Sequence, residues 1–456
     1  MTADREIVER VKHTRNKLRG LTIASVLEEF DGRMMGLDLG KRLAKYRKMR
    51  GSPFLFFRGS AYLFYFDIGR EWLPYRGDSD RPTWIQGDLH FENFGAFRSE
   101  TGRIVFDVND FDEGCTGSYL YDVLRMSVSL FLAMSEQGMP EEERAGVVSA
   151  YLSAYVKQIR KFAEREEDPR SLVFDVSTTD GPVRKLLKKT EKRAAGEFVE
   201  GITALEEGRR VFRWSEEILK PTDEERELLT NGWTDYLSTL SPRARKPDAY
   251  YRIKDIAVKH GSGTASIGLD RFYVLIEGDS GQGEVADDVV VEIKEVRTPV
   301  PAYFMPYNEA FWDSYAHQGK RVIVTQQAMH HEADPFLGYL TMDGRHFYAR
   351  ERSPYKKKLK ARKLEDEKDW RKTADCMGRV TAKLHARADA DSDLDGVPAY
   401  HSEDEIVRAI GDDKEAFRDY VTNRARAYAN QVEEDFELFK IWSEALERGK
   451  RRAKKL

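Results

Sequence analysis

Cysteine is scarce in this sequence, and long apolar segments are absent. Among 456 residues there are two cysteines, Cys115 and Cys376. Two thiols exclude a disulfide framework and a cysteine-rich zinc site, and such low cysteine use is typical of the reducing cytoplasm. The two most apolar stretches, residues 54–66 and 119–134, are interrupted by charged residues. They therefore predict no membrane-spanning segment.

The chain also lacks an excess of basic charge. Its formal net charge is -4, whereas nucleic-acid-binding domains carry a surplus of Lys and Arg that neutralises phosphates. We therefore expect no nucleic-acid partner. The first twenty residues are charged throughout and lack the apolar core of a signal peptide, which predicts a cytoplasmic protein. The histidines show no metal-ligand spacing, and the oligomeric state stays unknown.

The length of the chain predicts more than one folded unit, because a single hydrophobic core stops growing well below 456 residues. The periodicity divides the chain into four parts. Residues 1–50 form a helical extension, residues 51–247 are mainly helical, residues 248–350 alternate like an antiparallel sheet, and residues 351–456 return to helix and end in a basic tail. The fold class is therefore α+β.

The most informative stretch is residues 87–113, GDLHFENFGAFRSETGRIVFDVNDFDE. Asp88 is followed five positions later by Asn93, the spacing of the phosphoryl-transfer loop H-R-D-x-x-x-x-N. In that loop the Asp accepts the proton of the attacking hydroxyl group and the Asn binds a metal ion. We therefore predict Asp88 as the catalytic base, with His90 beside it as a further catalytic candidate.

Acidic residues follow the same motif after a predicted hairpin with Gly102 in its turn. Asp110 and Asp112 would point toward the Asp88 loop if the second strand stays extended. Carboxylates that converge repel one another unless a cation lies among them, so we predict a Mg²⁺ or Mn²⁺ site formed by Asn93, Asp110 and Asp112. The alternative is that these Asp and Asn residues are ordinary turn formers.

A glycine-rich segment, GSGTASIG, lies between two predicted strands and contains Gly263, Ser266 and Gly268. It lacks the Lys and Ser/Thr pair of a Walker A motif, so it is not a P-loop. It is either a plain hairpin turn or a loop whose backbone N–H groups cover nucleotide phosphates. The strand VVVEIKEV follows, as the V-A-I-K strand follows the kinase glycine loop, and it makes Lys294 the candidate phosphate ligand.

Two further residues complete the predicted site. Glu309 lies in the helical segment that follows the Lys294 strand and would orient the lysine. Arg58 lies in the aromatic stretch FLFFRGSAYLFYF, which we expect to form short strands. A charge there must be paired. Arg58 is therefore either a core residue bonded to a carboxylate or a ligand of phosphate or substrate.

The remaining β candidates are RVIVTQQA and the pair FLGYLTM and RHFYARE, which would complete a five-stranded antiparallel sheet. The basic run SPYKKKLKARK comes next. Such a run is typical of a solvated surface loop, and a contact with an anionic substrate is the alternative.

GDLHFENFG together with VFDVNDFDEG resembles the GDLHxxN and IDF(G/E)D motifs of aminoglycoside- and choline-kinase-like phosphotransferases. With SPFLFFRG, GTASIG, VEIKEV, GKRVIVTQQ, DPFLGYL and KLHARAD, it is also similar to a large uncharacterised bacterial family grouped with the kinase-like fold. The resemblance covers most of residues 45–440. It implies a two-lobe protein-kinase-like fold with Asp88 as base, Asn93 and Asp110 as metal ligands, residues 263–268 as nucleotide loop and Lys294 as phosphate lysine.

Two features depart from the kinase pattern. The predicted catalytic loop precedes the glycine segment, whereas kinases place the small lobe first, so the resemblance implies a circular permutation with the small lobe between two parts of the helical lobe. Glu292 occupies the place of the small Ala that lies against adenine in kinases. A carboxylate there opposes ordinary adenine stacking, which leaves the identity and the orientation of the nucleotide open.

These observations favour a Mg²⁺-dependent phosphotransferase that transfers a phosphoryl group from ATP or a related nucleotide to a small hydroxylated acceptor. The alternatives are a nucleotide-binding pseudokinase with a regulatory role, a protein kinase, a nucleotidyl transferase, and a metallophosphoesterase. The last is suggested because Asp88-Leu89-His90 is also a D-x-H pair. The sequence leaves the acceptor open, since kinase-like folds act on many substrates.

Overall fold

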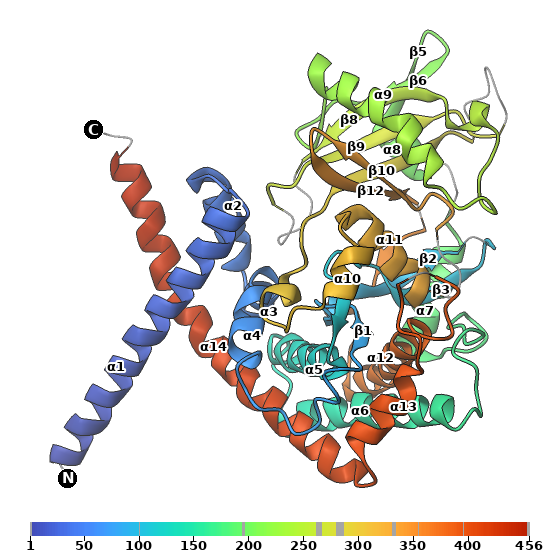
Figure 1. Cartoon of the computed structure of the whole chain (residues 1–456). Coiled ribbons are helices and arrows are strands. Elements are labelled where there is room, and N and C mark those ends of the chain that lie inside the picture. Colours follow the sequence, from blue (N-terminus) through green and yellow to red (C-terminus); the bar gives the residue numbers. More distant parts are fainter. Residues whose placement is uncertain are drawn as a thin grey trace.

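The computed structural model describes residues 2–99, 101–193, 197–260, 267–279, 287–330, 334–353, 355–394 and 396–453. The chain is a mixed α and β protein in which a six-stranded sheet lies at one end and a helical part at the other (Figure 1). Segments from both ends of the sequence build the helical part.

The N-terminal region is helical, which agrees with the prediction for residues 1–50. Its elements are α1 (Thr2–Leu27), a π-helix (Glu28–Met34), α2 (Leu39–Met49), α3 (Pro53–Gly59) and α4 (Ala61–Ile68). Helix α1 crosses the long C-terminal helix α14 (Lys414–Ala453), and both reach away from the rest of the molecule (Figure 1). The Arg19 side chain joins the two helices to α4, since it donates to Asp435 at 2.6 Å and to Asp67 at 2.7 Å.

The short strands around the predicted catalytic motif come next. They are β1 (Thr83–Ile85), the 3-10 turn Phe91–Asn93, β2 (Phe94–Arg98), β3 (Ile104–Val108) and β4 (Cys115–Gly117). The predicted hairpin is confirmed: β2 pairs with β3, and Gly102 adopts a φ of 84° in the turn between them. Strand β1 pairs with β4, which brings the start and the end of the motif side by side.

Helices α5 (Tyr119–Ser135), α6 (Glu141–Ala163) and α12 (Glu367–Arg387) form the centre of the helical part. They enclose the largest hydrophobic core, in which nearly every residue of α5 is buried. The other helices of this part are α7 (Gly181–Glu191), α13 (Ser402–Ile410) and the 3-10 turn Ala361–Lys363. A rigid, well-packed support of this kind holds the motif loop between β1 and β2 in place.

The large sheet has the strand order β11-β12-β10-β9-β8-β7 and is antiparallel. Its strands are β7 (Ile218–Leu219), β8 (Ile253–Lys259), β9 (Arg271–Ile276), β10 (Val289–Glu295), β11 (Gly338–Met342) and β12 (Arg345–Glu351). Helix α9 (Asp223–Ser238) covers one face together with the 3-10 turn Asp248–Tyr251. Helix α8 (Glu197–Ile202) and the hairpin of β5 (Thr203–Glu206) and β6 (Arg209–Phe212) pack on the other.

The connection from β10 back to β11 contains the 3-10 turn Val300–Tyr303, α10 (Glu309–Ser314) and α11 (Gln318–Met329). Here the strand prediction for RVIVTQQA was wrong, because this segment is α11. Its Val and Ile residues favour a strand locally. Residues on every side of α11 are buried between the sheet and the large core, however, so no amphipathic period marks the helix. The sheet consequently recruits β7 and has six strands instead of five.

The aromatic stretch near Arg58 was also predicted wrongly as strands. It forms α3 and α4, and the Ser52 hydroxyl caps α3 by accepting from the N–H of Leu55, with Pro53 in the first turn. Both helices are enclosed by core residues, so the sequence is apolar all round and shows no helical period. The β5–β6 hairpin, in a region predicted to be helical, is a further difference.

Candidate functional site

A cavity of about 180 Å³ brings together side chains from segments that are far apart in the sequence. Seven of the predicted site residues line it: Arg58, Asp88, His90, Asn93, Asp110, Asp112 and Lys294. They come from α3, the loop after β1, the loop after β3, and strand β10. The structure therefore brings the acidic motif and the lysine strand to one cavity.

The loop between β1 and β2 is held by its backbone. The Asp122 carboxylate, from the first turn of α5, accepts from the N–H groups of Gln86 at 2.6 Å and Gly87 at 2.9 Å. Gly87 has a φ of 86°, and a Cβ atom there would lie 2.1 Å from the carbonyl oxygen of Glu113. Only glycine permits this close approach, which presses the Asp88 loop against the acidic loop.

Asp122 is in turn supported by a buried polar chain. The Nε2 atom of His385 on α12 lies 3.3 Å from Asp122, and the Nδ1 atom of His385 lies 2.9 Å from the hydroxyl of Tyr155 on α6. All three side chains are buried. Three helices of the helical part therefore fix the position of the loop that carries Asp88.

Asp88 lies against a buried cation. The Nε atom of Arg125, a side chain with no exposed surface, donates to the Asp88 carboxylate at 2.6 Å. Burial raises the pKa of Asp88 above its usual value, and Arg125 opposes this shift. A carboxylate with a raised pKa is a stronger proton acceptor than an ordinary Asp. Arg125 was not identified from the sequence, because it lies in an apolar helix 37 positions away.

His90 and Arg58 contact each other at the edge of the cavity. Arg58 donates through Nε to the His90 Nε2 atom at 3.2 Å and through a guanidinium nitrogen to Glu92 at 2.5 Å. Burial, followed by the charge of Arg58, holds the pKa of His90 well below its usual value. His90 is therefore neutral at pH 7. Arg58 is paired with the Glu92 carboxylate, as the first alternative predicted. It also lines the cavity, and its role as a ligand of phosphate or substrate stays a prediction.

Asn93 and Asp110 provide the oxygen atoms best suited to a hard cation. The Asn93 amide nitrogen donates to the carbonyl of Asp88 at 2.8 Å, which fixes the orientation of the amide. Asp110 has a buried Oδ1 atom without a hydrogen-bond partner among the described residues. Burial alone would raise the pKa of Asp110, but Lys294 and Arg350 hold it below its usual value, so the carboxylate is ionised. Oxygen ligands of this kind fit Mg²⁺.

Lys294 spans the gap between the sheet and the acidic loop. Its ammonium group contacts one Asp112 oxygen, and the other accepts from the hydroxyl of Tyr348 on β12 at 2.8 Å. Ile293 faces α9, so Lys294 points to the opposite side of β10, as period 2 predicted. Asp112 is therefore engaged by protein groups, which leaves Asp110 as the better metal ligand of the two.

The carboxylates of the cavity do not meet at one point. Within the part of the chain that the structure describes, Asp389, His401 and Glu403 are the group of three whose ligand atoms all lie within 4.8 Å, and it is outside the cavity. The pairing of Asp88 with Arg125 and of Asp112 with Lys294 accounts for their separation.

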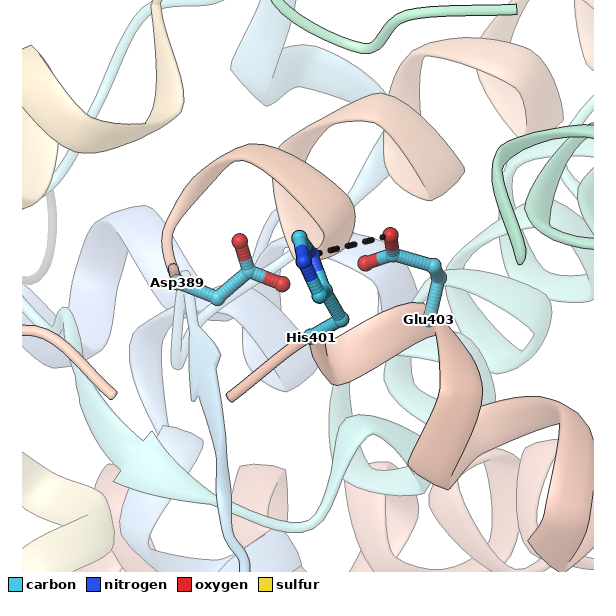
Figure 2. Close-up of side chains that lie close together, drawn as sticks. All are labelled: Asp389, His401 and Glu403. Carbon is cyan, nitrogen blue, oxygen red and sulfur yellow. Dashed lines mark ion pairs between the residues drawn. The ribbon is translucent and has the colours of Figure 1, made fainter. Parts of the chain in front are cut away.

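The Asp389 cluster joins α12 to α13. Figure 2 shows the carboxyl groups of Asp389 and Glu403 on either side of the His401 ring. The Asp389 carboxylate accepts from the backbone N–H of Ser402 at 2.5 Å, and Arg165 donates to Glu403 at 2.7 Å. These contacts stabilise the start of α13 without a ligand, so we assign the cluster a structural role.

Some predicted residues do not reach the cavity. Glu309 is exposed at the start of α10 and lines a different surface pocket, so the structure does not bring it to Lys294. The lysine is paired with Asp112 instead. Gly263 and Ser266 lie outside the described residues. Gly268 is described, with a φ of 92°, and a Cβ atom there would collide with Leu37 at 2.0 Å.

The basic run after β12 is more ordered than a solvated loop. It forms β13 (Lys357–Lys358), which pairs with β2, and the Lys356 ammonium donates to the carbonyl of Asn109 at 2.9 Å. Lys358 lines the cavity. The run therefore brings basic side chains to the acidic loop, and its contact with an anion stays a prediction.

Two groups of residues around the site were not found from the sequence: one supports the acidic loop and the other lines the cavity. Arg321 on α11 is fully buried and donates to the carbonyls of Gly114 at 2.6 Å and Asp112 at 2.8 Å. The other group is a wall from the N-terminal region, Phe30, Asp31, Met34, Met35 and Lys45. No local pattern marks either group, because their positions depend on contacts between distant segments.

Comparison with known proteins identifies one family. A family-wide profile described as an uncharacterized protein conserved in bacteria matches residues 41–441. No curated protein and no solved structure matches the chain. Across the described ranges, no helix is both long enough and apolar enough to cross a membrane.

Proposed function

Because the chain belongs to the DUF2252 family of bacterial proteins, whose description names no activity, we propose a function from the geometry of its cavity. The protein is a Mg²⁺-dependent phosphotransferase that transfers the γ-phosphoryl group of ATP or a related nucleotide to a small hydroxylated acceptor. The observation that carries the proposal is the convergence of Asp88, Asn93, Asp110 and Lys294 on one cavity.

The arrangement of the sheet supports a kinase-like origin of the site. Strands β8, β9 and β10 are consecutive neighbours, the glycine segment connects the first two, and Lys294 lies on the third. Protein kinases carry their phosphate lysine on the third strand after a glycine-rich loop. The catalytic loop precedes these strands in the chain, so we propose a circularly permuted kinase-like fold with the sheet inserted between two helical parts.

The chemistry follows from the positions of the side chains. The acceptor oxygen attacks the γ-phosphorus, the bond from that phosphorus to the β–γ bridging oxygen breaks, and the nucleoside diphosphate leaves. Asp88 takes the hydroxyl proton, and Arg125 keeps its carboxylate oriented. Asn93 and Asp110 would hold Mg²⁺, which neutralises charge on the transferring group. When the nucleotide binds, its phosphates would replace Asp112 as the partner of Lys294, and the lysine would then supply positive charge beside them.

Replacement of Asp88 tests the assignment. Asp88→Asn removes the proton acceptor and keeps the size of the side chain, so we expect Mg²⁺-dependent turnover of ATP to fall about 10²- to 10⁴-fold. ATP affinity should change little. The assay measures ADP release from ATP across a panel of sugars, amino alcohols and aminoglycosides. Asp343→Asn, in the β11–β12 turn where Asn is well tolerated, is the matched control.

A wild-type rate from Asp88→Asn would rule out Asp88 as the base. A second candidate function is a nucleotide-binding regulatory protein that transfers no phosphate. It is favoured by the ion pairs that engage Asp88 and Asp112 within the protein. Thermal stabilisation by ATP with Mg²⁺, without ADP release for any acceptor, would identify this second function.

Phosphoester hydrolysis is less well supported. Among the described residues that line the cavity, His90 is the one histidine, and its Nε2 atom already accepts from Arg58. Two-metal hydrolases bind their metals through several ligands on each ion. The D-x-H pair of Asp88 and His90 therefore lacks the partners that this chemistry requires.

A further inference from the structure

The space around Lys294 is bounded by two walls of different chemistry. One is the rest of strand β10, where Glu292 lies two residues before Lys294 and therefore on the same face. The other comes from the N-terminal region, where Met34 and Met35 line the cavity. A nucleotide whose phosphates reach Lys294 must place its base toward one of these walls.

The strand wall is closed by ion pairs. The Glu292 side chain is 3% exposed, and its two oxygens accept from Arg271 at 3.1 Å and from Arg350 at 2.8 Å. These charges hold the pKa of Glu292 below its usual value although burial would raise it. A base that moved into this position would have to separate buried charges from their partners, which is strongly unfavourable.

The space beyond Glu292 is filled as well. The Arg350 guanidinium lies 3.4 Å from the carbonyl oxygen of Asn109, and the Lys356 ammonium donates to the same oxygen at 2.9 Å. Both side chains connect the sheet to the acidic loop. The strand side therefore offers a flat aromatic ligand neither apolar surface nor room.

The N-terminal wall presents Met34 and Met35 as its apolar part and is firmly held. Met34 and Met35 end the π-helix and line the cavity together with Val296 and Val300. Arg297 donates to the carbonyl of Met35 at 2.8 Å, which attaches the segment to the chain just after β10. Apolar walls with a few polar groups at one end are the usual environment of a bound planar ligand.

A second anchor holds the same segment from behind. Asp31 is fully buried in the π-helix and accepts from Lys45 at 2.6 Å and from Tyr62 at 2.9 Å. The Phe30 ring stacks on Tyr62 with a centroid distance of 4.8 Å. These contacts hold the wall in place before a ligand binds. Binding therefore costs less conformational entropy than it would at a flexible segment.

We infer that the nucleobase of the bound nucleotide lies against the N-terminal wall formed by Met34, Met35, Val296 and Val300, on the side of Lys294 away from Glu292. This inference rests on the proposed function. It assigns a base-binding role to two residues that precede the family-matched region 41–441, Met34 and Met35. In kinases the adenine lies against a small Ala at the position of Glu292. The base in this protein would therefore point the opposite way from Lys294.

Photolabelling of the full-length chain tests the direction of the base. The probe is 8-azido-ATP with Mg²⁺, and unlabelled ATP displaces it from its site. After tryptic digestion, we expect ATP-displaceable label on the peptide of residues 34–41 or 298–320. Label on residues 272–294 or 353–356 would overturn the inference and leave the proposed function in place. No displaceable label on any peptide would overturn both.

A variant pair provides a second measurement. Met34→Glu places a charge on the proposed base wall, so we expect ATP affinity to fall at least tenfold while affinity for inorganic tripolyphosphate stays within twofold. Arg33→Ala changes the net charge equally at a side chain that is 83% exposed and should behave like wild type. Unchanged ATP affinity in a folded Met34→Glu protein would contradict the inference.

Discussion

Two lysine–aspartate pairs within this molecule have the same chemistry and different surroundings. Asp107 on β3 contacts Lys383 on α12, and their side chains are 5% and 2% exposed. Asp112 contacts Lys294 on β10, and these side chains are 16% and 4% exposed. The two aspartates are five residues apart in one acidic motif. The same acidic motif thus contains one aspartate in a core ion pair and one aspartate in an ion pair at the cavity.

The difference lies in access. Asp112 and Lys294 line a cavity of about 180 Å³, whereas Lys383 packs beneath the Phe174 ring in the core of the helical part. An anion that enters the cavity can replace Asp112 as the partner of Lys294. No ligand can reach Lys383 without local unfolding. We call Asp107–Lys383 the closed pair and Asp112–Lys294 the open pair. The closed pair should control the stability of the fold, and the open pair should control ligand binding.

The largest expected effect is at the closed pair. Lys383→Met leaves the buried Asp107 carboxylate without its cation, so we expect the free energy of unfolding to fall by about 3–5 kcal/mol. Urea denaturation at pH 7 measures this change. The double variant Asp107→Leu with Lys383→Met removes both charges and should recover most of the loss. Wild-type stability of the single variant would contradict the role assigned to the pair.

A smaller effect should appear with pH at the neighbour of the closed pair. His330 lies 4.0 Å from Asp107, stacks on Phe97 and hydrogen-bonds the carbonyl of Val108 at 2.7 Å. Burial lowers the pKa of His330 to about 4 from its ordinary 6.5. The lowered pKa contributes stability above pH 6.5, and this contribution is lost as the pH falls toward 4.

The His330→Gln variant removes that titration and keeps a hydrogen-bond donor. We expect the stability difference between wild type and variant to be about 2 kcal/mol smaller at pH 5 than at pH 8. Denaturation curves at the two pH values measure it. His260→Gln, at an exposed position, is the control and should show no pH-dependent difference. A constant difference for His330→Gln would show that the histidine does not stay neutral in the fold.

The smallest expected change in stability is at the open pair. Lys294→Met leaves Asp112 its hydrogen bond from Tyr348, and Asp112 is more exposed than Asp107, so the free energy of unfolding should fall by less than it does for Lys383→Met. Affinity for ATP with Mg²⁺ should fall about 10- to 100-fold, because a charge-assisted contact with phosphate is lost. Calorimetric titration measures this. A large loss of stability with unchanged ATP affinity would contradict the assignment of the Asp112–Lys294 pair to ligand binding.

Local patterns were reliable where a segment needs only its own neighbours. The β2–β3 hairpin, the β11–β12 hairpin around Gly344 and the long terminal helices formed as expected, because turn residues and hydrophobic periods encode them directly. The errors at α3, α4 and α11 concern helices enclosed by other elements, whereas the β5–β6 hairpin is an error of the opposite kind. Complete burial removes the contrast between apolar and polar faces from which a period is read.

For the site, the sequence by itself determined the groups to which we assign the proposed chemistry: a loop with Asp88 and Asn93, an acidic loop with Asp110, and a strand with Lys294. Residue type and spacing are sufficient for that, because each motif is short. Only the tertiary structure decided the partners, with Arg125 beside Asp88, Asp112 rather than Glu309 beside Lys294, and an N-terminal wall across the cavity. These contacts join residues 37 positions apart, as for Asp88 and Arg125, or 182 positions apart, as for Asp112 and Lys294. They depend on how the whole core packs, and no local pattern records them.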